Sequence, residues 1–360
     1  MLYPIGIQSF EDIRRGGYVY VDKTALIYKL AATGKYYFLS RPRRFGKSLL
    51  ISTMEAYFKG KKELFDGLAV ASLEKDWTEY PVLHLDLSGV AYNQEEVIAK
   101  VLSNALCKWE KEYGSENNSD IPGIRFGNVI EAACRKTGRQ VVILVDEYDK
   151  PVIDNLDRPE LQDKMRETLR GFYGVMKSKD GRIRLGFLTG VTKIGKMSVF
   201  SDLNNPKDIS MDSRYTDICG VSETDLTDCF AESVRKLAEA NGLSEEECRQ
   251  KLALMYDGYH FCEEQTEGMF NPFSVLNMLR QLKFNYYWFA TGTPTFLVKM
   301  LQRTEFDVRE LVNGIEVSEA SLMSYRVDDD DPVPMIYQSG YLTIKGYDPE
   351  FNLYKLKLPN

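Results

Sequence analysis

The sequence predicts an α/β protein whose first part is a parallel sheet with helices on both faces, followed by a mainly helical second part. Over roughly residues 1–212, short apolar segments alternate with helical segments, which is the pattern of βαβ units. One of them, 141–145 (VVILV), is a continuous apolar run, typical of a strand buried on both faces. After Tyr215 helical periodicity dominates.

Hydrophobic spacing places the elements of the first part in order. The segment 82–87 (VLHLDL) alternates apolar and polar residues, as a strand does. The segment 94–113 repeats apolar residues at helical spacing, and Gly138 suits the C-terminal cap of a later helix. The predicted strands are 36–39, 82–87, 141–145 and 183–188, and the predicted helices are 49–58, 94–113, 128–135 and 161–176.

The second part reads as helices closed by a small β-hairpin. Ser244 followed by Glu247 fits a capping box at the start of one helix. The predicted helices are 223–241, 244–256, 272–282 and 295–301, and the predicted hairpin strands are 333–337 and 341–347. We therefore expect two domains, a sheet domain over 1–212 and a helical lid with a winged-helix-like arrangement over 213–360.

Composition and charge exclude several classes of protein. The chain has 360 residues, a formal net charge of −7 and a pI of about 5.3, so it carries no overall basic footprint for nucleic acid. No apolar run is long enough for a membrane span, and the N-terminal stretch MLYPIGIQSFEDIRR has no basic region followed by an apolar core, so we expect a cytoplasmic protein without membrane contact. The 6 cysteines form no C-x-x-C pair, which predicts reduced thiols and no zinc site.

A basic, glycine-containing loop, SRPRRFGKSLL at 40–50, lies between a predicted strand and a predicted helix. This is the context that a phosphate-binding loop requires. The helix N-terminus favours an anion, Gly46 lets the backbone approach phosphate, and Lys47 can reach the β- and γ-phosphates. The Ser48 hydroxyl is a candidate Mg²⁺ ligand. The nucleotide-binding residues predicted in this loop are Arg43, Arg44, Phe45, Gly46, Lys47, Ser48 and Leu49.

The loop departs from the usual pattern, G-x-x-x-x-G-K-[ST], because Arg41 stands at its first glycine position. A GKS tripeptide alone also occurs at ordinary surface helix starts. For Arg41, Arg43 and Arg44 the sequence leaves open whether they contact phosphate, contact a neighbouring subunit or belong to a solvated basic loop. A second motif is needed to support the first.

Two consecutive carboxylates supply that second motif at the end of the apolar run 141–145. Strand ends of an open α/β sheet face the crevice where ligands bind. We expect Asp146 to hold Mg²⁺ and Glu147 to polarise the attacking water, although an ordinary polar strand end would look the same. The strand at 82–87 is expected to separate the phosphate-loop strand from the acidic strand, as in the ASCE or AAA-like class of P-loop ATPases.

A third candidate follows the strand at 183–188, in the sequence LTGVTK. The next strand end in such a fold supplies a polar sensor of the γ-phosphate. We expect Thr192 to contact the nucleotide and Lys193 to take part in catalysis, although strand-end hydroxyls also cap helices. Asp149 and Lys150 pair either with each other or with Mg²⁺-bound water.

These motifs together resemble the bacterial AAA-ATPase-like family, distant relatives of STAND and archaeal-type P-loop ATPases. The resemblance covers essentially the whole chain and is most specific in SRPRRFGKS and VDEYDKP. Other matching stretches are YPIGIQSFEDIRRGGYVYVDKT, FLTGVTKIGKMSVFSDLNNPKDIS, YDGYHF, FNPFSVLNML, YYWFATGTPTFLV and MIYQSGYLTI. In this family the missing first glycine is normal.

The resemblance implies an N-terminal ATPase domain followed by a helical and winged-helix-like region. It also implies a place near the nucleotide for Tyr20, Asp22, Lys23 and Thr24 of the YVDKT stretch. Full-length members commonly carry a C-terminal domain similar to PD-(D/E)XK nucleases, and we expect this chain to stop near where that domain would begin.

The sequence thus favours an enzyme that hydrolyses ATP with Mg²⁺ and whose nucleotide state gates a downstream effector, either nuclease-like, a nucleic acid or a protein. The alternatives are a nucleotide-binding switch and an interaction module with little or no turnover. ATP is favoured over GTP because no guanine-reading N-K-x-D motif occurs. The sequence leaves open the oligomeric state.

Overall fold

The computed structural model describes the chain except for residues 117–118, 194–205, 289–294, 305, 324–330 and 360. Its first part contains a five-stranded sheet in the order β2-β3-β4-β1-β5, in which every neighbouring pair is parallel. The strands are β1 (Tyr36–Ser40), β2 (Val82–Asp86), β3 (Val141–Asp146), β4 (Ile183–Gly190) and β5 (Lys207–Asp208). The α/β class and the predicted strands of the first part are confirmed.

The order of the strands corrects one prediction. β4 lies between β1, which leads into the phosphate loop, and β3, which ends in the acidic residues. The strand at 82–87 was expected there, but β2 pairs with the other side of β3 and forms an edge of the sheet. The burial of the two strands explains this, because β4 is buried at every position except Arg184, whereas β2 carries the partly exposed His84 and the exposed Asp86.

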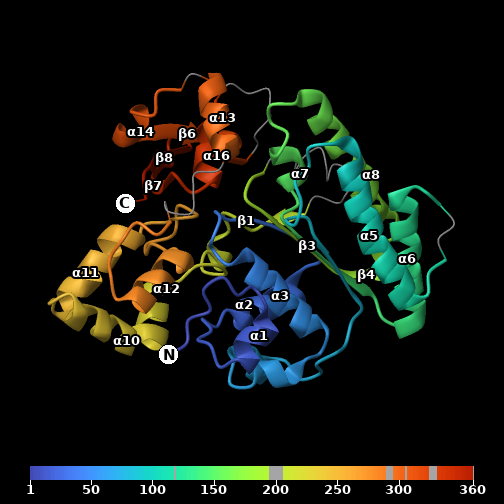
Figure 1. Cartoon of the computed structure of the whole chain (residues 1–360), viewed down its shortest axis with the longest axis horizontal. Coiled ribbons are helices and arrows are strands. Elements are labelled where there is room, and N and C mark those ends of the chain that lie inside the picture. The colour runs from blue at the N-terminus through green and yellow to red at the C-terminus, as the bar shows by residue number, and fades with distance from the viewer. Residues whose placement is uncertain (117–118, 194–205, 289–294, 305, 324–330, 360) are drawn as a thin grey trace.

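Helices cover both faces of the sheet (Figure 1). Alternate strand residues divide between two apolar cores, so that Val142 and Leu144 of β3 face one core and Ile143 and Val145 face the other. The first core is covered by α1 (Phe10–Arg15), α2 (Thr24–Thr33), α3 (Lys47–Phe58) and α4 (Ala69–Leu73). The second is covered by α5 (Glu95–Tyr113), α6 (Pro122–Thr137), α7 (Lys150–Ile153) and α8 (Pro159–Ser178).

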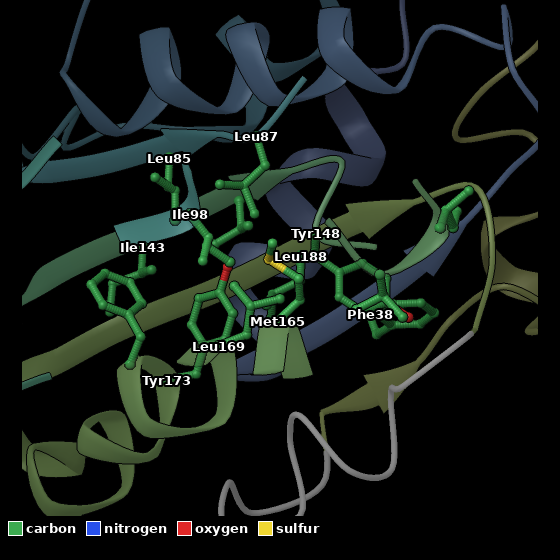
Figure 2. Packing of buried hydrophobic residues seen from close by; sticks show 14 of the residues in the cluster. Phe38, Leu85, Leu87, Ile98, Ile143, Tyr148, Met165, Leu169, Tyr173 and Leu188 are labelled. Carbon is green, nitrogen blue, oxygen red and sulfur yellow. The ribbon is translucent and has the colours of Figure 1, made fainter. Parts of the chain in front are cut away.

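Figure 2 shows the second core, where α8 packs against the strands. Leu169 and Tyr173 of α8 lie beneath Ile143 of β3 and Leu188 of β4 (Figure 2). Since both faces of the sheet are sealed by helices, the edge at the carboxyl ends of the strands is the place where side chains following the strands can reach a ligand.

The second part begins with three helices that share a separate apolar cluster: α10 (Glu223–Ala240), α11 (Glu245–Tyr256) and α12 (Pro272–Gln281). The predicted capping box of Ser244 and Glu247 is present at the start of α11. Val19 and Val21 of the N-terminal segment pack against this cluster and join it to the sheet part.

The last described segments form a three-stranded antiparallel sheet in the order β6-β8-β7 with short helices around it. The elements are α13 (Thr295–Thr304), α14 (Glu310–Asn313), β6 (Ile315–Ser318), α15 (Glu319–Met323), α16 (Val333–Gln338), β7 (Thr343–Asp348) and β8 (Leu353–Lys357). Within the residues that the structure describes, no helix has both the length and the apolar character needed to cross a lipid bilayer.

One predicted strand of this region is wrong. Residues 333–337 belong to the helix α16, and the hairpin is formed by β7 and β8 instead. Every residue of α16 is buried, so the segment shows no polar face, and a short run of this kind has no periodicity that separates helix from strand. Pro334 in the first turn favours the helix, because its fixed φ suits a helix start.

Candidate functional site

The phosphate loop connects β1 to α3 and turns at two residues with positive φ. Arg44 has φ 69° and Gly46, the N-cap of α3, has φ 93°. Arg41 has no positive φ, so the position that usually holds glycine needs no left-handed backbone in this loop. Gly46 has no side chain to cap the helix, which leaves the first N–H groups of α3 to an anion.

The side chain of Lys47 lies over this loop and is 5% exposed. Its Nζ donates hydrogen bonds to the carbonyl oxygens of Arg41 at 3.0 Å and Pro42 at 3.1 Å. Lys47 forms no ion pair in the described part of the chain, so its charge is balanced by carbonyl dipoles. A phosphate oxygen is a stronger partner than a carbonyl, because a hydrogen bond between two charged groups is about twice as strong as a neutral one.

A cavity of about 440 Å³ adjoins the loop and is within the size range of small-molecule sites. Parts of the chain that are distant in sequence form its walls: the segment 4–8, the phosphate loop with the start of α3, Ser88 after β2, the turn after β3 with Lys150, and the start of α12. Most of the predicted site residues line it, namely Arg43, Arg44, Gly46, Lys47, Ser48, Leu49 and Glu147. Lys47 and Glu147 therefore converge on one cavity.

Two arginines at the cavity wall lie over aromatic rings of the second part. The Arg43 guanidinium is 5.7 Å from the ring centroid of Phe296, and that of Arg44 is 4.9 Å from the centroid of Phe273. Both side chains are exposed, and neither forms an ion pair among the described residues. Lys150, which also lines the cavity, pairs with Asp154 at 2.7 Å and not with Asp149.

The two carboxylates at the end of β3, those of Asp146 and Glu147, lie in different surroundings. Asp146 is 4% exposed and is not part of the cavity lining. Its Oδ1 accepts hydrogen bonds from the Thr189 hydroxyl at 2.6 Å and from the Glu147 N–H at 3.0 Å. Its Oδ2 has no hydrogen-bond partner in the described residues. Glu147 has φ 53°, an unfavourable conformation for a residue with a side chain, and it lines the cavity. Strained backbone of this kind is concentrated at functional sites.

Asp149 joins the turn after β3 to the chain after β4. Its carboxylate accepts hydrogen bonds from the N–H of Val191 at 3.1 Å, the N–H of Thr192 at 2.7 Å and the hydroxyl of Thr192 at 2.8 Å. Gly190 permits this approach, because a Cβ there would lie 2.5 Å from the carboxylate. The Thr192 hydroxyl is thereby engaged away from the cavity.

Burial raises the pKa of Asp149 to about 6, and the negative charge of Glu147 adds to the effect. Since the ordinary pKa is 3.8, this carboxyl stabilises the fold fully below pH 3.8, and that stability is lost as the pH rises through 6. Relative to Asp149→Asn, the wild type should therefore lose about 2 kcal/mol of unfolding free energy between pH 4 and pH 7. Urea unfolding of both proteins across this range measures the difference, and a difference that does not vary with pH would contradict it.

The remaining predicted residues do not line the main cavity. Lys193 Nζ pairs with the buried Asp208 of β5 at 3.1 Å, and its N–H donates to the side chain of Gln338 in α16. Neither Lys193 nor Thr192 is part of the cavity wall. Phe45 lines a second cavity, which also adjoins Gly46.

This second cavity has a volume of about 100 Å³ and mainly apolar walls. It shares walls with the first cavity at Pro4, Gly46, Leu49, Pro272 and Leu276. Its other walls are 19–21, Lys23, Phe45, Leu50, 218–221 and Phe230. Tyr20 and Lys23 of the YVDKT stretch thus line this cavity. The Asp22 carboxylate instead accepts hydrogen bonds from the N–H and hydroxyl of Thr24 and from the N–H of Ala69.

Sequence reasoning missed three contributors to the site. The first is Thr189, whose hydroxyl donates a hydrogen bond to Asp146. It lies near the end of β4, the neighbour of the acidic strand, and this position could have indicated its role. The segment 4–8 and the residues Pro272, Phe273 and Leu276 of α12 also line the main cavity. Both lie in stretches that match the family, YPIGIQSFEDIRRGGYVYVDKT and FNPFSVLNML, which was the available signal, but their residue types indicate no chemical role.

The sheet order and the loop geometry define a P-loop protein with an AAA-like fold. A strand separates the phosphate-loop strand from the acidic strand, and the loop leads into a helix with a glycine N-cap. The chain belongs to a family of predicted AAA-ATPases, whose model matches residues 4–200. It is also 40% identical over 365 residues to an "uncharacterized protein in vnfD 5'region" of Azotobacter chroococcum mcd 1, and the match covers 99% of this chain and 67% of that protein.

Proposed function

We propose that the 440 Å³ cavity binds ATP with Mg²⁺ and that the protein hydrolyses the bond between the β- and γ-phosphates. The observation that carries the proposal is the convergence of Lys47, Ser48 and Glu147 on this one cavity at the carboxyl edge of the sheet. Membership of a predicted AAA-ATPase family supports ATP binding and hydrolysis in general.

The loop cations would hold the phosphates. Lys47 would exchange the carbonyls of Arg41 and Pro42 for phosphate oxygens, and the first amides of α3 would donate to them as well. Arg43 and Arg44 are exposed at the same wall and would add charge-assisted hydrogen bonds. Each of these interactions grows with the negative charge that develops on the transferred phosphoryl group.

Two side chains would hold a magnesium ion, which prefers oxygen ligands. Ser48 lines the cavity and would supply its hydroxyl, and the buried Asp146, whose Oδ1 accepts from Thr189, would supply Oδ2 directly or through a water molecule. When bound, the ion would neutralise charge on the β- and γ-phosphates. Thr189 would fix the Asp146 carboxylate through the 2.6 Å hydrogen bond to Oδ1, which leaves Oδ2 directed elsewhere.

Glu147 would orient the attacking water and accept its proton. It lies at the cavity wall directly after Asp146, the proposed metal ligand. The hydrogen bond from the Glu147 N–H to Asp146 Oδ1 stabilises the left-handed backbone of Glu147. Asp146 would thus hold the metal ion, and Glu147 would act on the attacking water. Lys193 and Thr192 would act indirectly, by holding the chain after β4 through Asp208 and Asp149.

We assign the 100 Å³ cavity to the base of the nucleotide. It adjoins the phosphate cradle at Gly46 and Leu49, and its walls are mainly apolar, as suits a planar ring system. The ribose would then lie between the two cavities, near Pro4, Pro272 and Leu276, which line both.

Filling this cavity tests the assignment. Val21→Phe should raise the Kd for MgATP about tenfold or more, because the added ring occupies the place of the base, and a tenfold change corresponds to about 1.4 kcal/mol. The Kd for magnesium tripolyphosphate, which has no base, should stay within about twofold, a change of under 0.5 kcal/mol. Calorimetric titration of both ligands measures this. Equal weakening of both would refute the base site, and a wild type that binds neither would refute the proposed function.

The nucleotide state would control the second part of the chain. Residues on both sides of position 212 line the cavities, so closure around a nucleotide would move the region 213–360 relative to the region 1–212. The three-stranded sheet β6-β8-β7 with its helices is compatible with a winged-helix-like unit. A downstream effector, nuclease-like or otherwise, would respond to this movement.

A further inference from the structure

We propose that Arg41 is a positioning residue that transmits the occupancy of the nucleotide site from the phosphate loop to the second part of the chain. The inference rests on the proposed nucleotide site. Arg41 stands where the usual loop pattern has glycine, is 1% exposed, and is the largest side chain in the structure that is buried to this degree. Its role is distinct from that of Arg43 and Arg44, which are exposed.

The Arg41 guanidinium binds four backbone carbonyls. Nη1 donates to Ser40 O at 3.0 Å and to Ser210 O at 2.7 Å, and Nη2 donates to Tyr215 O at 3.2 Å and Thr216 O at 3.4 Å. Three of these acceptors belong to the segment 210–216, which leads from the sheet part into the helices of the second part. The planar fork of arginine suits this task, since its donors have fixed directions.

An aromatic ring of the second part completes the environment of Arg41. The guanidinium lies 3.9 Å from the ring centroid of Phe261, a cation–π contact. Phe45 of the same loop packs edge-on against Phe261 at 5.6 Å and Tyr259 at 4.8 Å. The chain after α16 also contacts the loop closely, because a Cβ on Gly340 would lie 2.7 Å from Pro42. The loop is therefore packed against the segment 259–261 and Gly340 together.

The backbone of Arg41 is connected to the nucleotide site at the same time. Its carbonyl oxygen accepts the hydrogen bond from Lys47 Nζ at 3.0 Å. A phosphate that draws the amine away changes the environment of this peptide group, while the guanidinium of the same residue keeps its hold on 210–216. A displacement of residue 41 then moves 210–216 and the ring of Phe261, because both are attached to the side chain.

Hydrogen exchange of the full chain, with and without a magnesium complex of a non-hydrolysable ATP analogue, tests this inference. In the wild type, the analogue should slow exchange in the loop 42–50 and also change it in 210–216 and 259–262. In Arg41→Met, the loop should still be protected, but the change in 210–216 and 259–262 should disappear. The Kd of the analogue should rise about tenfold, or 1.4 kcal/mol. Arg41→Lys should restore the response only in part, because an ammonium lacks the planar fork.

Arg184→Met is the matched control. Arg184 also donates from its guanidinium to a backbone carbonyl, that of Ala31 at 2.6 Å, but it lies at the start of β4, at the opposite end of the strand from the site. This variant should keep the response of the wild type. If Arg41→Met does not fold, Phe261→Leu removes the ring beside the guanidinium together with its contact to Phe45. This variant should weaken the change in 259–262, whereas the change in 210–216, which depends on the hydrogen bonds of Arg41, should remain.

The outcomes separate the two proposals. If the wild type does not bind the analogue, the proposed function fails and the inference fails with it. If the wild type binds and protects its loop but 210–216 and 259–262 stay unchanged, the inference is overturned and the proposed function stands. The inference is also overturned if Arg41→Met, or Phe261→Leu in its place, transmits the change as the wild type does.

Discussion

Replacing Glu147 with glutamine is expected to lower the rate of ATP hydrolysis by a factor of about 10² to 10⁴ while MgATP still binds, since a positioned general base contributes about that factor. The side chain lines the cavity, whereas the groups proposed to bind MgATP are those of the phosphate loop, Ser48 and Asp146. Glutamine keeps the size of the side chain and its hydrogen-bonding oxygen but cannot take a proton from water. Steady-state phosphate release gives the rate, and calorimetry gives the affinity.

The control is Glu350→Gln, which makes the same chemical change at an exposed residue near the β7–β8 turn. It should hydrolyse ATP like the wild type. Equal residual turnover in the wild type and in Glu147→Gln would favour a nucleotide-binding switch over an enzyme. Undetectable binding of MgATP to the wild type at millimolar concentration would leave only an interaction module.

The part of the site that could be predicted from sequence is the part next to strand ends. The phosphate loop follows β1 directly, and Asp146 and Glu147 follow the apolar run of β3, so their meeting at one edge follows from the parallel sheet alone. The walls from 4–8 and α12 could not be predicted in this way. They reach the cavity through tertiary packing, and their residues are chemically ordinary.

The expectation of a γ-phosphate sensor shows a different limit of sequence-based prediction. Sequence reasoning favoured Thr192 and Lys193 because hydroxyl and amine groups follow the strand, but their buried partners are Asp149 and Asp208. A buried polar group must find a partner, and which one it finds depends on residues distant in sequence. Thr189, still within β4, is the hydroxyl that contacts the acidic strand end.

The elements of the fold also divide into those that local sequence predicts and those that depend on tertiary packing. Strands such as 141–145 were predictable because burial on both faces requires an uninterrupted apolar run. The order of strands was predicted wrongly, although the alternation of apolar and polar residues in β2 indicates an edge strand, because the crossover that places β4 between β1 and β3 has no motif of its own. The helix α16 was mistaken for a strand because complete burial removes the polar face by which a helix is recognised.

Lys47→Met should remove most of the stabilisation that MgATP gives to the protein. Charge-assisted hydrogen bonds to phosphate are worth about 1.5–3 kcal/mol each, so the loss of this amine should raise the Kd about 100-fold or more. At a ligand concentration of 100 times the wild-type Kd, the stabilisation should fall from about 2.7 kcal/mol to about 0.4 kcal/mol. Chemical unfolding with and without MgATP measures both values.

The same substitution should change the stability measured without nucleotide far less. Methionine removes the hydrogen bonds to the carbonyls of Arg41 and Pro42, but it also removes a charge that is 5% exposed and has no carboxylate partner in the described residues. These effects have opposite signs, so we expect a net change within about 1 kcal/mol. Lys35→Met, at the other end of β1, removes an amine paired with Asp180 and should leave the response to MgATP intact. A loss of several kcal/mol without nucleotide in Lys47→Met would instead mean that this lysine is held in place for the stability of the loop, and the case for its role in binding phosphate would fall with it.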